Sequence, residues 1–492
     1  MSDEKRHSGA ENPVPEQDHN AVIEQRYKNL KKLEESGIDP FGAGFPNVMN
    51  IQDIKQTFSE GKVVRVAGRI MSRRDMGKSI FADLKDFSGK VQLYFKKDLV
   101  GEKSFDVIKS LDIGDIIGID GKLFKTRTGE DTVQVETFTF LSKSLHPLPE
   151  KWHGLKDVEA RYRQRYVDLI INDDTRDKFR KRIKLVKSIR EYLDGIGFLE
   201  VETPMMHPIA GGAAGKPFVT HHETLDMDLF LRIAPEIYLK KLLVGGFDKV
   251  YEINRSFRNE GISTRHNPEF TMIEVYEAYS NCEGMMNLTE NLIRNAAKQV
   301  LGTEKLNYQG KEIDLSVFKR VSFAQLMEEN FGIKVDDPLP SWVAKLKSKG
   351  VKIEGDKVSK TQLLNIIGDL VEPKGESNPV FVVDIFKEIS PLAKEKKGSP
   401  GIVDRFELYM GGMEIANAYS ELNDPIDQRK RFEAQAKEDP KAVVDEDFIA
   451  ALEYGMPPAG GLGIGIDRLT MLFTDSASIR EVILFPHMRP GE

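Results

Sequence analysis

The sequence predicts an α+β protein with two domains, a five-stranded β-barrel followed by a larger antiparallel sheet flanked by helices. Three observations support this fold class. The chain has 492 residues, of which 40% are hydrophobic, which is enough to build more than one core. Five short segments with alternating apolar and polar residues lie within residues 61–145. Beyond residue 176, strand-like segments joined by hairpins are mixed with helix-like segments.

The first 60 residues predict a tail, a helix and a linker. Residues 1–20 are polar and predict a flexible tail. Residues 21–37 carry apolar side chains at helical spacing and end at Gly37, a typical residue at the end of a helix. The Gly- and Pro-rich stretch that follows indicates that this helix and a linker fill residues 21–60.

Residues 61–145 predict the barrel. Asp86–Gly89 and Thr128–Asp131 have the composition of turns, and the stretch between Asp98 and Leu111 is helix-like. Five strands and one helix within about 80 residues favour a closed barrel of the OB type, although the pattern also fits other small β-domains. The alternating segments are KVVRVAGRIM, SIFADLKD, KVQLYF, IIGIDGKLFKT and TVQVETFTFL.

A proline-bearing linker over residues 146–175 leads to the second domain, which we expect to span residues 176–492. A strongly basic helix over Thr175–Asp194 opens this domain, and its apolar stripe includes Phe179, Ile183 and Leu193. Four later segments predict strands: DKVYEINRSFRNE, TMIEVYEAY, PVFVVDIF and RFELYMGGMEIANAY. Four others predict helices: Cys282–Val300, Asp427–Lys437, Asp445–Tyr454 and Gly465–Phe473.

Composition excludes several classes of protein. No apolar run approaches the roughly 18 residues that span a bilayer, so we expect no membrane association. The single cysteine, Cys282, excludes an internal disulfide and a Cys-rich zinc site, and indicates a reducing, cytoplasmic location. Because the formal net charge is -7, binding to nucleic acid would need a local basic patch.

Three nucleotide-binding signatures are approached but not met. The loop Gly211–Lys216 is one residue too short for a P-loop, and Pro217 stands where Ser or Thr must hold magnesium. Residues Gly461–Gly465 are followed by Ile466, where the dinucleotide fingerprint requires glycine. Lys357–Thr361 resembles the lysine loop of class I aminoacyl-tRNA synthetases. Its partner motif is missing from any first strand, so we interpret it as a solvated turn.

The densest polar cluster runs from Phe257 to Phe270, between two strand-like segments. Arg258 and Arg265 suit phosphate, because a guanidinium is always charged and can bind two oxygens at once. Glu260 can accept a hydrogen bond from an amine, and Phe270 can stack on a purine ring. A charged surface hairpin explains the same composition equally well.

Near the C-terminus, glycines at positions 460–465 lead into an apolar helix that carries Arg468 in its first turn. Glycines allow close approach of the backbone, and a helix N-terminus favours an anion. An arginine on an apolar helix requires a partner. That partner is either a carboxylate within the protein or a bound phosphate.

The segment Arg405–Ala416 predicts a hairpin with Gly411-Gly412 as its two-residue turn. Tyr409 then lies opposite Glu414, and Glu407 shares that face of the sheet. Two carboxylates that converge on one face repel unless a cation lies between them, and hard oxygen ligands suit Mg²⁺. Because two candidate arginines for phosphate lie in the same domain, the pair indicates ATP with Mg²⁺.

Taken together, these motifs resemble those of class II lysyl-tRNA synthetases of the bacterial type, within the aspartate, asparagine and lysine subgroup, over residues 20–492. Three signatures carry the resemblance. They are the basic helix leading to Gly197–Pro204, the segment Phe257–Glu260 with its loop to Phe270, and the glycine-rich helix start with Arg468. In the family the first signature forms a dimer interface, and the barrel binds the anticodon.

The resemblance implies a two-step reaction in which lysine and ATP form lysyl-adenylate and a ribose hydroxyl of tRNA(Lys) then accepts the lysyl group. It implies a homodimer and up to three Mg²⁺ ions bound with ATP. Arg258 and Arg468 would be the catalytic residues. The implied ATP-binding residues are Arg258, Glu260, His266, Phe270 and Arg468. The implied lysine-binding residues are Gly212, Glu236, Glu274, Tyr276, Asn417 and Glu421. The implied metal ligands are Glu407 and Glu414, and the implied anticodon-binding residues are Arg69, Phe81 and Gln92.

The position of Glu421 requires a departure from simple strand geometry. A lysine site needs an anion for the substrate ammonium, and the resemblance assigns this role to Glu421. Glu421 is an odd number of residues from Glu414, so a bulge or turn around Ala418–Ser420 must reorient it. The alternative is that Glu421 caps the helix that begins near Asn423.

Three other functions remain open from the sequence. An aspartyl or asparaginyl enzyme shares the architecture, but an aspartate site needs a cation and Asn417–Asp424 contains none. A paralogue that lysylates a translation factor resembles the catalytic domain but lacks the barrel. A catalytically inactive RNA-binding or scaffold protein would be expected to lose residues such as Arg258, Glu407, Glu414 and Arg468, which are all present.

Overall fold

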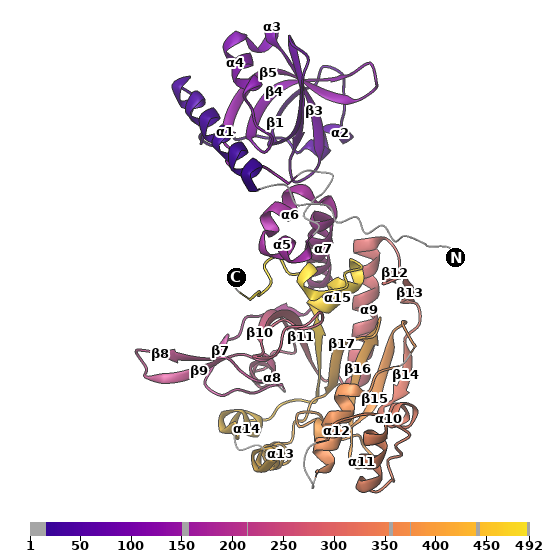
Figure 1. Cartoon of the computed structure of the whole chain (residues 1–492). Coiled ribbons are helices and arrows are strands. Elements are labelled where there is room, and N and C mark those ends of the chain that lie inside the picture. Colours follow the sequence, from indigo (N-terminus) through magenta and orange to yellow (C-terminus); the bar gives the residue numbers. More distant parts are fainter. Residues whose placement is uncertain are drawn as a thin grey trace, which may run out of the picture. The chain divides into compact units, whose positions relative to one another are not determined.

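A computed structural model describes residues 16–149, 157–213, 215–353, 358–373, 375–438 and 443–489. The chain forms two compact units, Met1–Lys156 and Asp157–Glu492, and each is described here by itself (Figure 1). Most of the predicted tail at residues 1–20 and part of the predicted linker at 146–175 lie outside the described residues. Within the described ranges, no helix is both long enough and apolar enough to cross a membrane.

The first unit is a closed β-barrel, as the alternating segments predicted. Its strands pair in the order β1-β2-β3-β5-β4, and the parallel pairing of β3 with β5 closes the barrel. Alternate residues point inward, so that Ile80, Ala82 and Leu84 of β2 are buried while Phe81 between them is not. The strands are β1 (Val63–Asp75), β2 (Ser79–Lys85), β3 (Lys90–Lys96), β4 (Ile116–Lys125) and β5 (Asp131–Ser142).

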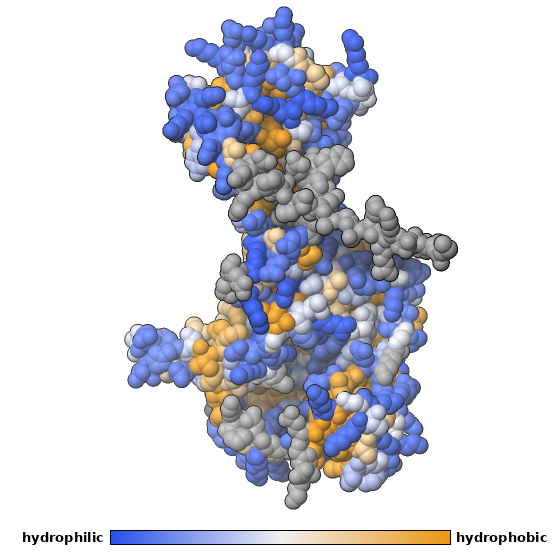
Figure 2. Space-filling model, in the orientation of Figure 1, coloured by the Kyte–Doolittle hydropathy of each residue, from blue (hydrophilic) through white to orange (hydrophobic). Residues whose placement is uncertain are grey.

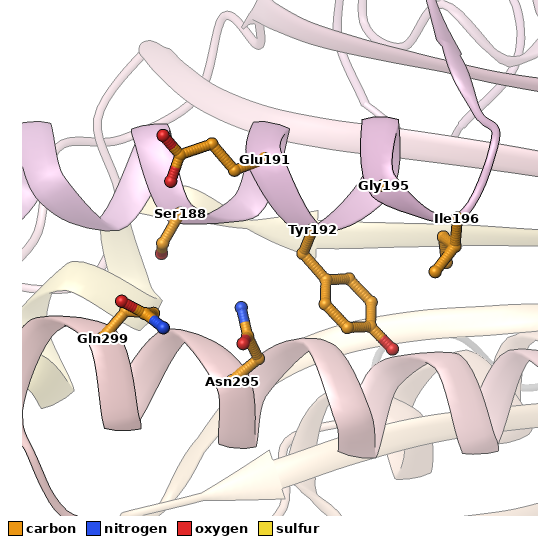
Figure 3. Close-up of a pocket in the computed structure, with 7 residues that line it drawn as sticks. All are labelled: Ser188, Glu191, Tyr192, Gly195, Ile196, Asn295 and Gln299. Carbon is orange, nitrogen blue, oxygen red and sulfur yellow. The ribbon is translucent and has the colours of Figure 1, made fainter.

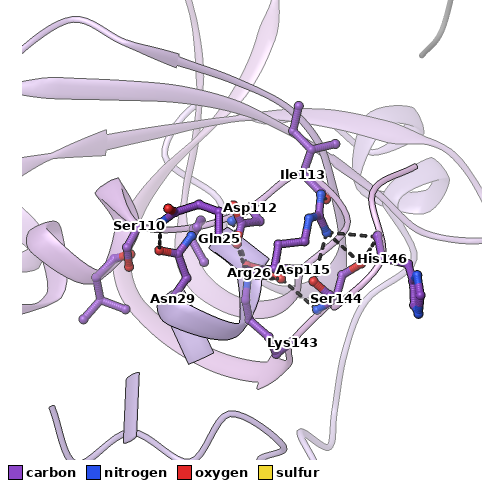
Figure 4. Close-up of polar contacts among 12 residues, drawn as sticks. Gln25, Arg26, Asn29, Ser110, Asp112, Ile113, Asp115, Lys143, Ser144 and His146 are labelled. Atoms are coloured by element: carbon purple, nitrogen blue, oxygen red, sulfur yellow. Dashed lines mark hydrogen bonds and ion pairs between the residues drawn. The ribbon is translucent and has the colours of Figure 1, made fainter. Parts of the chain in front are cut away.

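Four helices accompany the barrel: α1 (Glu16–Glu35), α2 (Ile51–Gln56), α3 (Lys97–Val100) and α4 (Glu102–Lys109). A polar network fixes α1 to the barrel (Figure 4). The guanidinium of Arg26 donates to the carbonyl oxygens of Ile113 and Ser144 at 2.8 and 2.9 Å. Next to it, the fully buried Nζ of Lys143 lies 2.9 Å from the carboxylate of Asp115. These contacts make the predicted N-terminal helix part of the barrel unit.

The second unit is built on a sheet of eight strands in the order β14-β15-β16-β17-β18-β11-β10-β6. Its interior is antiparallel, as predicted, but β14 pairs with β15 and β6 pairs with β10 in parallel at the two edges. Parallel neighbours need a long crossover, and helices α10–α12 supply one between β14 and β15. The strands are β6 (Leu199–Glu200), β10 (Lys249–Phe257), β11 (Glu269–Ala278), β14 (Lys319–Ser322), β15 (Val380–Phe386), β16 (Ile402–Met410), β17 (Met413–Ser420) and β18 (Ala459–Gly465).

Helices α7 (Asp173–Gly195), α9 (Cys282–Leu301) and α15 (Ile466–Phe473) enclose the main core on one face of this sheet. Ile273 and Val275 of β11 point into that core, so Glu274 and Tyr276 lie on the opposite face. The predicted apolar stripe of α7 is wrong at one position, because the side chain of Ile183 is 63% exposed. The opposite face of the sheet therefore carries the polar groups considered below.

Much of the region after α9 carried no sequence motif; its helices form a second core with β15, whereas Leu306, Tyr308, Ile313 and Leu315 belong to the main core. The elements of this region are β12 (Lys305–Tyr308), β13 (Lys311–Asp314), β14, α10 (Phe323–Phe331), α11 (Leu339–Ser348), α12 (Lys360–Leu370) and β15. The interpretation of Lys357–Thr361 as a solvated turn is wrong where the chain is described. Ser359 caps α12 and forms a capping box with Gln362. Lys357 itself lies outside the described residues.

The remaining elements complete the second unit. A small sheet of β7 (Met206–His207), β9 (Met227–Leu231) and β8 (Val219–His222) carries a hairpin whose visible tip is hydrophilic (Figure 2). Helix α8 (Glu236–Val244) packs with α14 (Glu446–Glu453) against the sheet. The others are α5 (Val158–Arg163), α6 (Arg165–Ile171), η1 (Lys387–Ile389), α13 (Pro425–Glu438) and η2 (Ile479–Glu481).

Candidate functional site

Glycines at alternate positions of β18, in the middle of the sheet, leave space without side chains on its polar face. The register places Gly461 between Tyr276 and Tyr419, and Gly463 between Glu274 and Asn417. A Cβ atom on Gly461 would lie 1.9 Å from Oε1 of Glu421 and 2.6 Å from the ring of Tyr276. Only glycine fits at this position, because any side chain would displace the carboxylate or the ring.

The β16–β17 hairpin has the predicted register at its turn. Gly411 and Gly412 both have positive φ, and Tyr409 lies opposite Glu414. The predicted reorientation around Ala418–Ser420 is wrong, because the register shifts at Ile415 instead. Ile415 is one extra residue on β17, and a one-residue bulge exchanges the faces of all residues that follow. The bulge therefore places Glu421 on the same face as Glu414.

Three buried glutamates form a cluster on this face, which we call the carboxylate cluster: Glu236, Glu274 and Glu421. The buried ammonium of Lys240 lies 2.5 Å from Oε1 of Glu236 and 2.5 Å from Oε2 of Glu421. Tyr276 donates to Oε2 of Glu274 at 3.1 Å. Oε1 of Glu421 is buried and has no hydrogen-bond partner among the residues that the structure describes. The cluster thus contains an acceptor that the protein itself does not use.

The charges of the cluster do not balance, because three carboxylates surround one ammonium. Burial, followed by repulsion from Glu236, raises the pKa of Glu274 well above its usual value. Burial also raises the pKa of Glu421 to about 8, and Lys240 offsets this only in part because Glu236 adds to it. The pKa of Lys240 is raised, since its two carboxylates outweigh the effect of burial. A bound ligand with positive charge would relieve this excess.

Two sequence-based arguments about Glu421 are changed by these contacts. Glu421 does not cap α13, because the carboxylate of Asp424 accepts from the backbone N–H groups of Ile426 and Asp427. The argument against an aspartate site was that Asn417–Asp424 contains no cation. A cation is nevertheless present next to Glu421, because Lys240 of α8 contacts it. The cation comes from a distant segment, and the other carboxylates outnumber it.

The other end of this face is positive, and we call Arg258, His266 and Arg468 the arginine end. Arg468 donates to the carbonyl oxygen of Glu414 at 2.8 Å and to its Oε2 at 3.3 Å, and its second nitrogen lies 3.0 Å from Nε2 of His266. Nε of Arg258 is buried without a hydrogen-bond partner, and the guanidinium lies 5.2 Å from the centre of the Phe270 ring. Burial lowers the pKa of Arg258, which keeps its charge at any ordinary pH.

Glu407 and Glu414 lie between the two ends. Glu407 accepts from Arg405 at 2.7 Å and from the hydroxyl of Tyr409 at 3.2 Å. Burial raises the pKa of Glu407, and the neighbouring Glu414 contributes to the rise. Within the described residues no cluster of three or more potential ligands could hold a metal by itself. Two hard carboxylates fit Mg²⁺ only together with oxygens of a bound phosphate.

The remaining predicted residues differ in how closely the structure brings them to the carboxylate cluster. Gly212 has a φ of +89°, and a Cβ there would lie 3.5 Å from Cβ of Glu236. Asn417 lies in line with Gly463 and accepts from Nε of Arg405 at 3.1 Å. Glu260 and His266 are exposed in the loop between β10 and β11, as is Arg265. Of these three residues, His266 contacts the arginine end through Arg468.

In the barrel, Phe81 belongs to an aromatic row on the outer surface. Its ring centre lies 4.9 Å from that of Tyr94, which lies 5.9 Å from that of Phe124. Gln92 is buried beside this row and accepts from the hydroxyl of Thr132 at 3.0 Å. Arg69 is not opposite Phe81. Arg74 takes that place, while Arg69 donates to the carbonyl oxygen of Gly114 at 2.6 Å.

One surface depression of the described residues lies away from these groups. It has a volume of about 340 Å³ between α7 and α9, and Ser188, Tyr192 and Ile196 face Asn295 and Gln299 across it (Figure 3). None of the predicted site residues lines it. Its lining contains no cation for phosphate and a single carboxylate, so its chemistry does not fit the predicted ligands.

Comparison with known proteins identifies the family. A family model described as "tRNA synthetases class II (D, K and N)" matches residues 157–489, and one for the OB-fold nucleic acid binding domain matches residues 64–141. A lysine–tRNA ligase of Carboxydothermus hydrogenoformans is 54% identical over 487 residues, which cover 97% of this chain and 99% of the relative. This chain belongs to the lysine–tRNA ligase family of class II tRNA synthetases.

Other relatives agree with this assignment. The lysine–tRNA ligase of Pelotomaculum thermopropionicum is 54% identical over 489 residues, covering 97% of this chain and 96% of the relative. That of Fusobacterium nucleatum is 50% identical over 483 residues, covering 96% and 98%. The class II synthetase model covers the D, K and N subfamilies together and does not distinguish among them. The relatives do distinguish them, because they are lysine–tRNA ligases that match over nearly their full length. A paralogue without the barrel is excluded, since the OB-fold match coincides with the closed barrel.

Some members of the site could not be recognised from motifs of the family. Lys240 and Tyr419 both contact Glu236, and the hydroxyl of Tyr419 donates to Oε1 of that carboxylate at 2.6 Å. Arg405 holds both Glu407 and Asn417. The alternation of side chains along β16 could have indicated Arg405, because residues two positions apart in a strand lie on the same face and Arg405 lies two residues before Glu407. Lys240 had no such signal.

Proposed function

We propose that this protein ligates L-lysine to tRNA(Lys) in two steps, through a lysyl-adenylate. The observation that carries the lysine specificity is the carboxylate cluster, in which Oε1 of Glu421 is buried without a hydrogen-bond partner. Three carboxylates face one ammonium, so full ionisation leaves an excess of two negative charges. Lysine carries two ammonium groups, and its binding would balance the cluster. Aspartate and asparagine carry only the α-ammonium, so their binding would leave one negative charge of the cluster unbalanced.

The residues divide the substrate between them. Glu236 and Gly212 would receive the α-ammonium, and Glu421, with Glu274 and Tyr276, would receive the side-chain ammonium. Asn417 would lie near the carboxylate. The spacing supports this division, because Gly212 adjoins Glu236, and Gly461 leaves the space beside Glu421 and Tyr276 clear of side chains.

The arginine end would hold ATP. Arg258 would bind the α-phosphate together with the lysine carboxylate, and Arg468 and His266 would bind the outer phosphates. Phe270 would stack on the adenine ring, and Glu260 would accept hydrogen bonds from the base. Arg258 supports this role because its Nε has no partner within the described protein although it is buried.

Glu407 and Glu414 would hold up to three Mg²⁺ ions jointly with the phosphates. When bound, Mg²⁺ would neutralise charge on phosphate oxygens. Arg405 and Arg468 hold these two carboxylates on one face of the sheet, which prepares them to act as ligands. The chain's own residues otherwise act by positioning the lysine carboxylate in line with the α-phosphorus and by stabilising negative charge there.

The decisive experiment measures exchange of pyrophosphate into ATP with each of the twenty amino acids. Exchange that depends on lysine supports the proposal. Exchange that depends on aspartate or asparagine would identify that amino acid as the substrate in place of lysine. The absence of exchange with every amino acid would identify a catalytically inactive protein. Transfer of labelled lysine to tRNA(Lys) then tests the second step.

The barrel would read the anticodon through Phe81 and Gln92, with Arg69 beside them. An outward aromatic row suits unpaired bases, which stack on aromatic rings. Phe81→Ala should weaken tRNA binding by about 1–3 kcal/mol and leave lysyl-adenylate formation unchanged. A fall in the unfolding temperature without a selective loss of tRNA affinity would instead assign Phe81 to barrel stability.

We also propose that the protein acts as a homodimer in the cytoplasm. Exposed apolar side chains support a subunit interface: Ile183 within α7, Ile196 just after it, Leu199 in β6 and Phe247 before β10. Exposed apolar residues are typical of contact surfaces. Light scattering of Ile183→Asp should show a monomer, and an unchanged mass would exclude this surface.

A further inference from the structure

Lys240 has no role in the reaction as proposed above, yet it occupies the centre of the carboxylate cluster. Its side chain is fully buried, and its ammonium contacts Oε1 of Glu236 and Oε2 of Glu421 at 2.5 Å each. The rings of Tyr419 and Phe448 lie 5.6 and 5.8 Å from the same nitrogen. A buried ammonium requires compensating partners, because burial of charge is costly, and Lys240 has two of them.

The two carboxylates come from different parts of the fold. Glu236 begins α8, one helical turn before Lys240, whereas Glu421 follows the end of β17. Lys240 therefore connects the helix to the sheet through one ammonium. Neutralising a single carboxylate would need only one of these contacts, so the second contact has a geometric consequence. It fixes where the carboxylate of Glu421 lies relative to that of Glu236.

The ion pair also determines which oxygen of Glu421 is available. Lys240 contacts Oε2, and Oε1 lies over Gly461 next to the ring of Tyr276. Tyr419 and Lys240 similarly share Oε1 of Glu236, whereas its Oε2 has no hydrogen bond with the residues that the structure describes. Each of the two glutamates thus offers one oxygen to a ligand while the other is held.

We propose that Lys240 is a positioning residue that sets the separation between Glu236 and Glu421, and with it the length of amino acid that the site accepts. This inference rests on the proposed lysine specificity, in which Glu236 and Glu421 receive the two ammonium groups. An amino acid one methylene shorter, such as ornithine, cannot reach both oxygens at a fixed separation. Without Lys240 the two carboxylates would repel each other and lose their fixed spacing.

The test measures pyrophosphate exchange with lysine and with ornithine for the wild-type protein, Lys240→Met and Lys240→Arg. Lys240→Met should raise the KM for lysine about tenfold and lower the lysine-to-ornithine ratio of kcat/KM by a similar factor, with the KM for ATP changed by no more than about twofold. Lys241→Met is the matched control, because Lys241 is the next residue of α8 and pairs with Asp447 at the surface. It should behave as wild type.

A double variant separates positioning from a general structural role. If Lys240 acts through Glu421, then Lys240→Met should add little to the lysine KM of Glu421→Gln. Additive effects, or equal losses for lysine and ATP, would overturn the proposal. Should Lys240→Met fail to fold, Lys240→Arg decides, because it keeps the charge and changes the reach. A folded Lys240→Arg with the wild-type lysine KM and the wild-type ratio would also overturn it.

The same measurements distinguish this inference from the proposed function. A wild-type protein that does not activate lysine overturns both. A wild-type protein that activates lysine, combined with Lys240 variants of unchanged selectivity, overturns only the role of Lys240.

Discussion

The arginine end and the carboxylate cluster lie on one face of the same sheet, but their charged side chains differ in exposure to water. At the arginine end, the side chain of Arg468 is 23% exposed, and that of its partner Glu414, next to this end, is 39% exposed. In the carboxylate cluster, those of Lys240 and Glu421 are fully buried. Water screens charges strongly in the first case and little in the second. The same kind of ion pair therefore has a different strength at the two ends.

This difference corresponds to the demands of the two ligands. If the arginine end binds ATP as proposed, pyrophosphate would leave from there after each adenylate is formed, and partial hydration of the cations would permit its release. Amino-acid identity is decided by a single ammonium, and a buried, unscreened anion distinguishes it most strongly from a neutral or acidic side chain. The predictions below test whether changes at one end leave the other unaffected.

The largest effect is expected from Glu414→Gln, which removes a charge at the phosphate side while retaining an oxygen for Arg468. The rate of adenylate formation should fall about a hundredfold, because the lost charge acts on metal and phosphate. Lysine affinity, measured by calorimetry, should be nearly unchanged. Glu312→Gln is the control, since the side chain of Glu312 is 58% exposed and pairs only with the exposed Lys305 among the described residues. Wild-type exchange by Glu414→Gln at limiting Mg²⁺ would show that Glu414 is not a metal ligand.

Glu421→Gln makes the reciprocal change in the carboxylate cluster. It keeps the shape of the side chain and removes the charge, so the KM for lysine should rise at least about tenfold while the KM for ATP stays the same. Steady-state pyrophosphate exchange measures both constants. If both rise together, the two ends are coupled and the separation drawn above is wrong.

The sequence predicted the arginine end more fully than the carboxylate cluster. Arg258, His266 and Phe270 belong to one segment, so a local motif contains them all. The turn at Gly411-Gly412 also fixes the pairing of Tyr409 with Glu414, because the side-chain period of a strand leaves no other choice. Outward placement of Phe81 follows from the same alternation.

The carboxylate cluster depends on features that no local pattern shows. The bulge at Ile415 adds one residue to β17, and packing of the sheet decides its position. Lys240 approaches Glu421 from a helix far away in the sequence, so only the tertiary fold brings them together. Buried polar contacts between distant elements are the part of a site that sequence reasoning finds last.

A smaller effect is expected when the space next to Glu421 is filled. Gly461→Ala would place a methyl group 1.9 Å from Oε1 of Glu421, and the carboxylate would have to move. Overpacking of about 1 kcal/mol would lower kcat/KM for lysine roughly fivefold. Gly463→Ala is the matched control on the same strand, because its nearest neighbour would be the flexible end of Met272 at 3.3 Å. Equal effects of the two substitutions would indicate general strain in β18 rather than a specific clash.

The smallest effect is a change in bound protons. Since burial and Glu236 raise the pKa of Glu274 well above its usual value and that of Glu421 to about 8, the substrate-free cluster holds protons at pH 7. An approaching ammonium lowers both pKa values, so lysine binding should release about one proton. Calorimetry in buffers with different ionisation enthalpies measures this number. In Glu421→Gln it should be smaller.

Binding of ATP at the arginine end should take up protons, whereas binding of lysine releases them, so ATP binding is the internal control. Burial and Arg468 lower the pKa of His266, so an approaching phosphate would favour uptake of a proton there.

The raised pKa of Glu421 also has a consequence for stability. Its folded value lies above the unfolded one, so this carboxyl group stabilises the substrate-free protein at low pH, and that contribution is lost as pH rises toward about 8. The unfolding temperature without substrate should therefore fall over this range, and less so in Glu421→Gln. Proton uptake on lysine binding, or a pH dependence of unfolding that is identical in the variant, would mean that the cluster is already ionised before substrate binds.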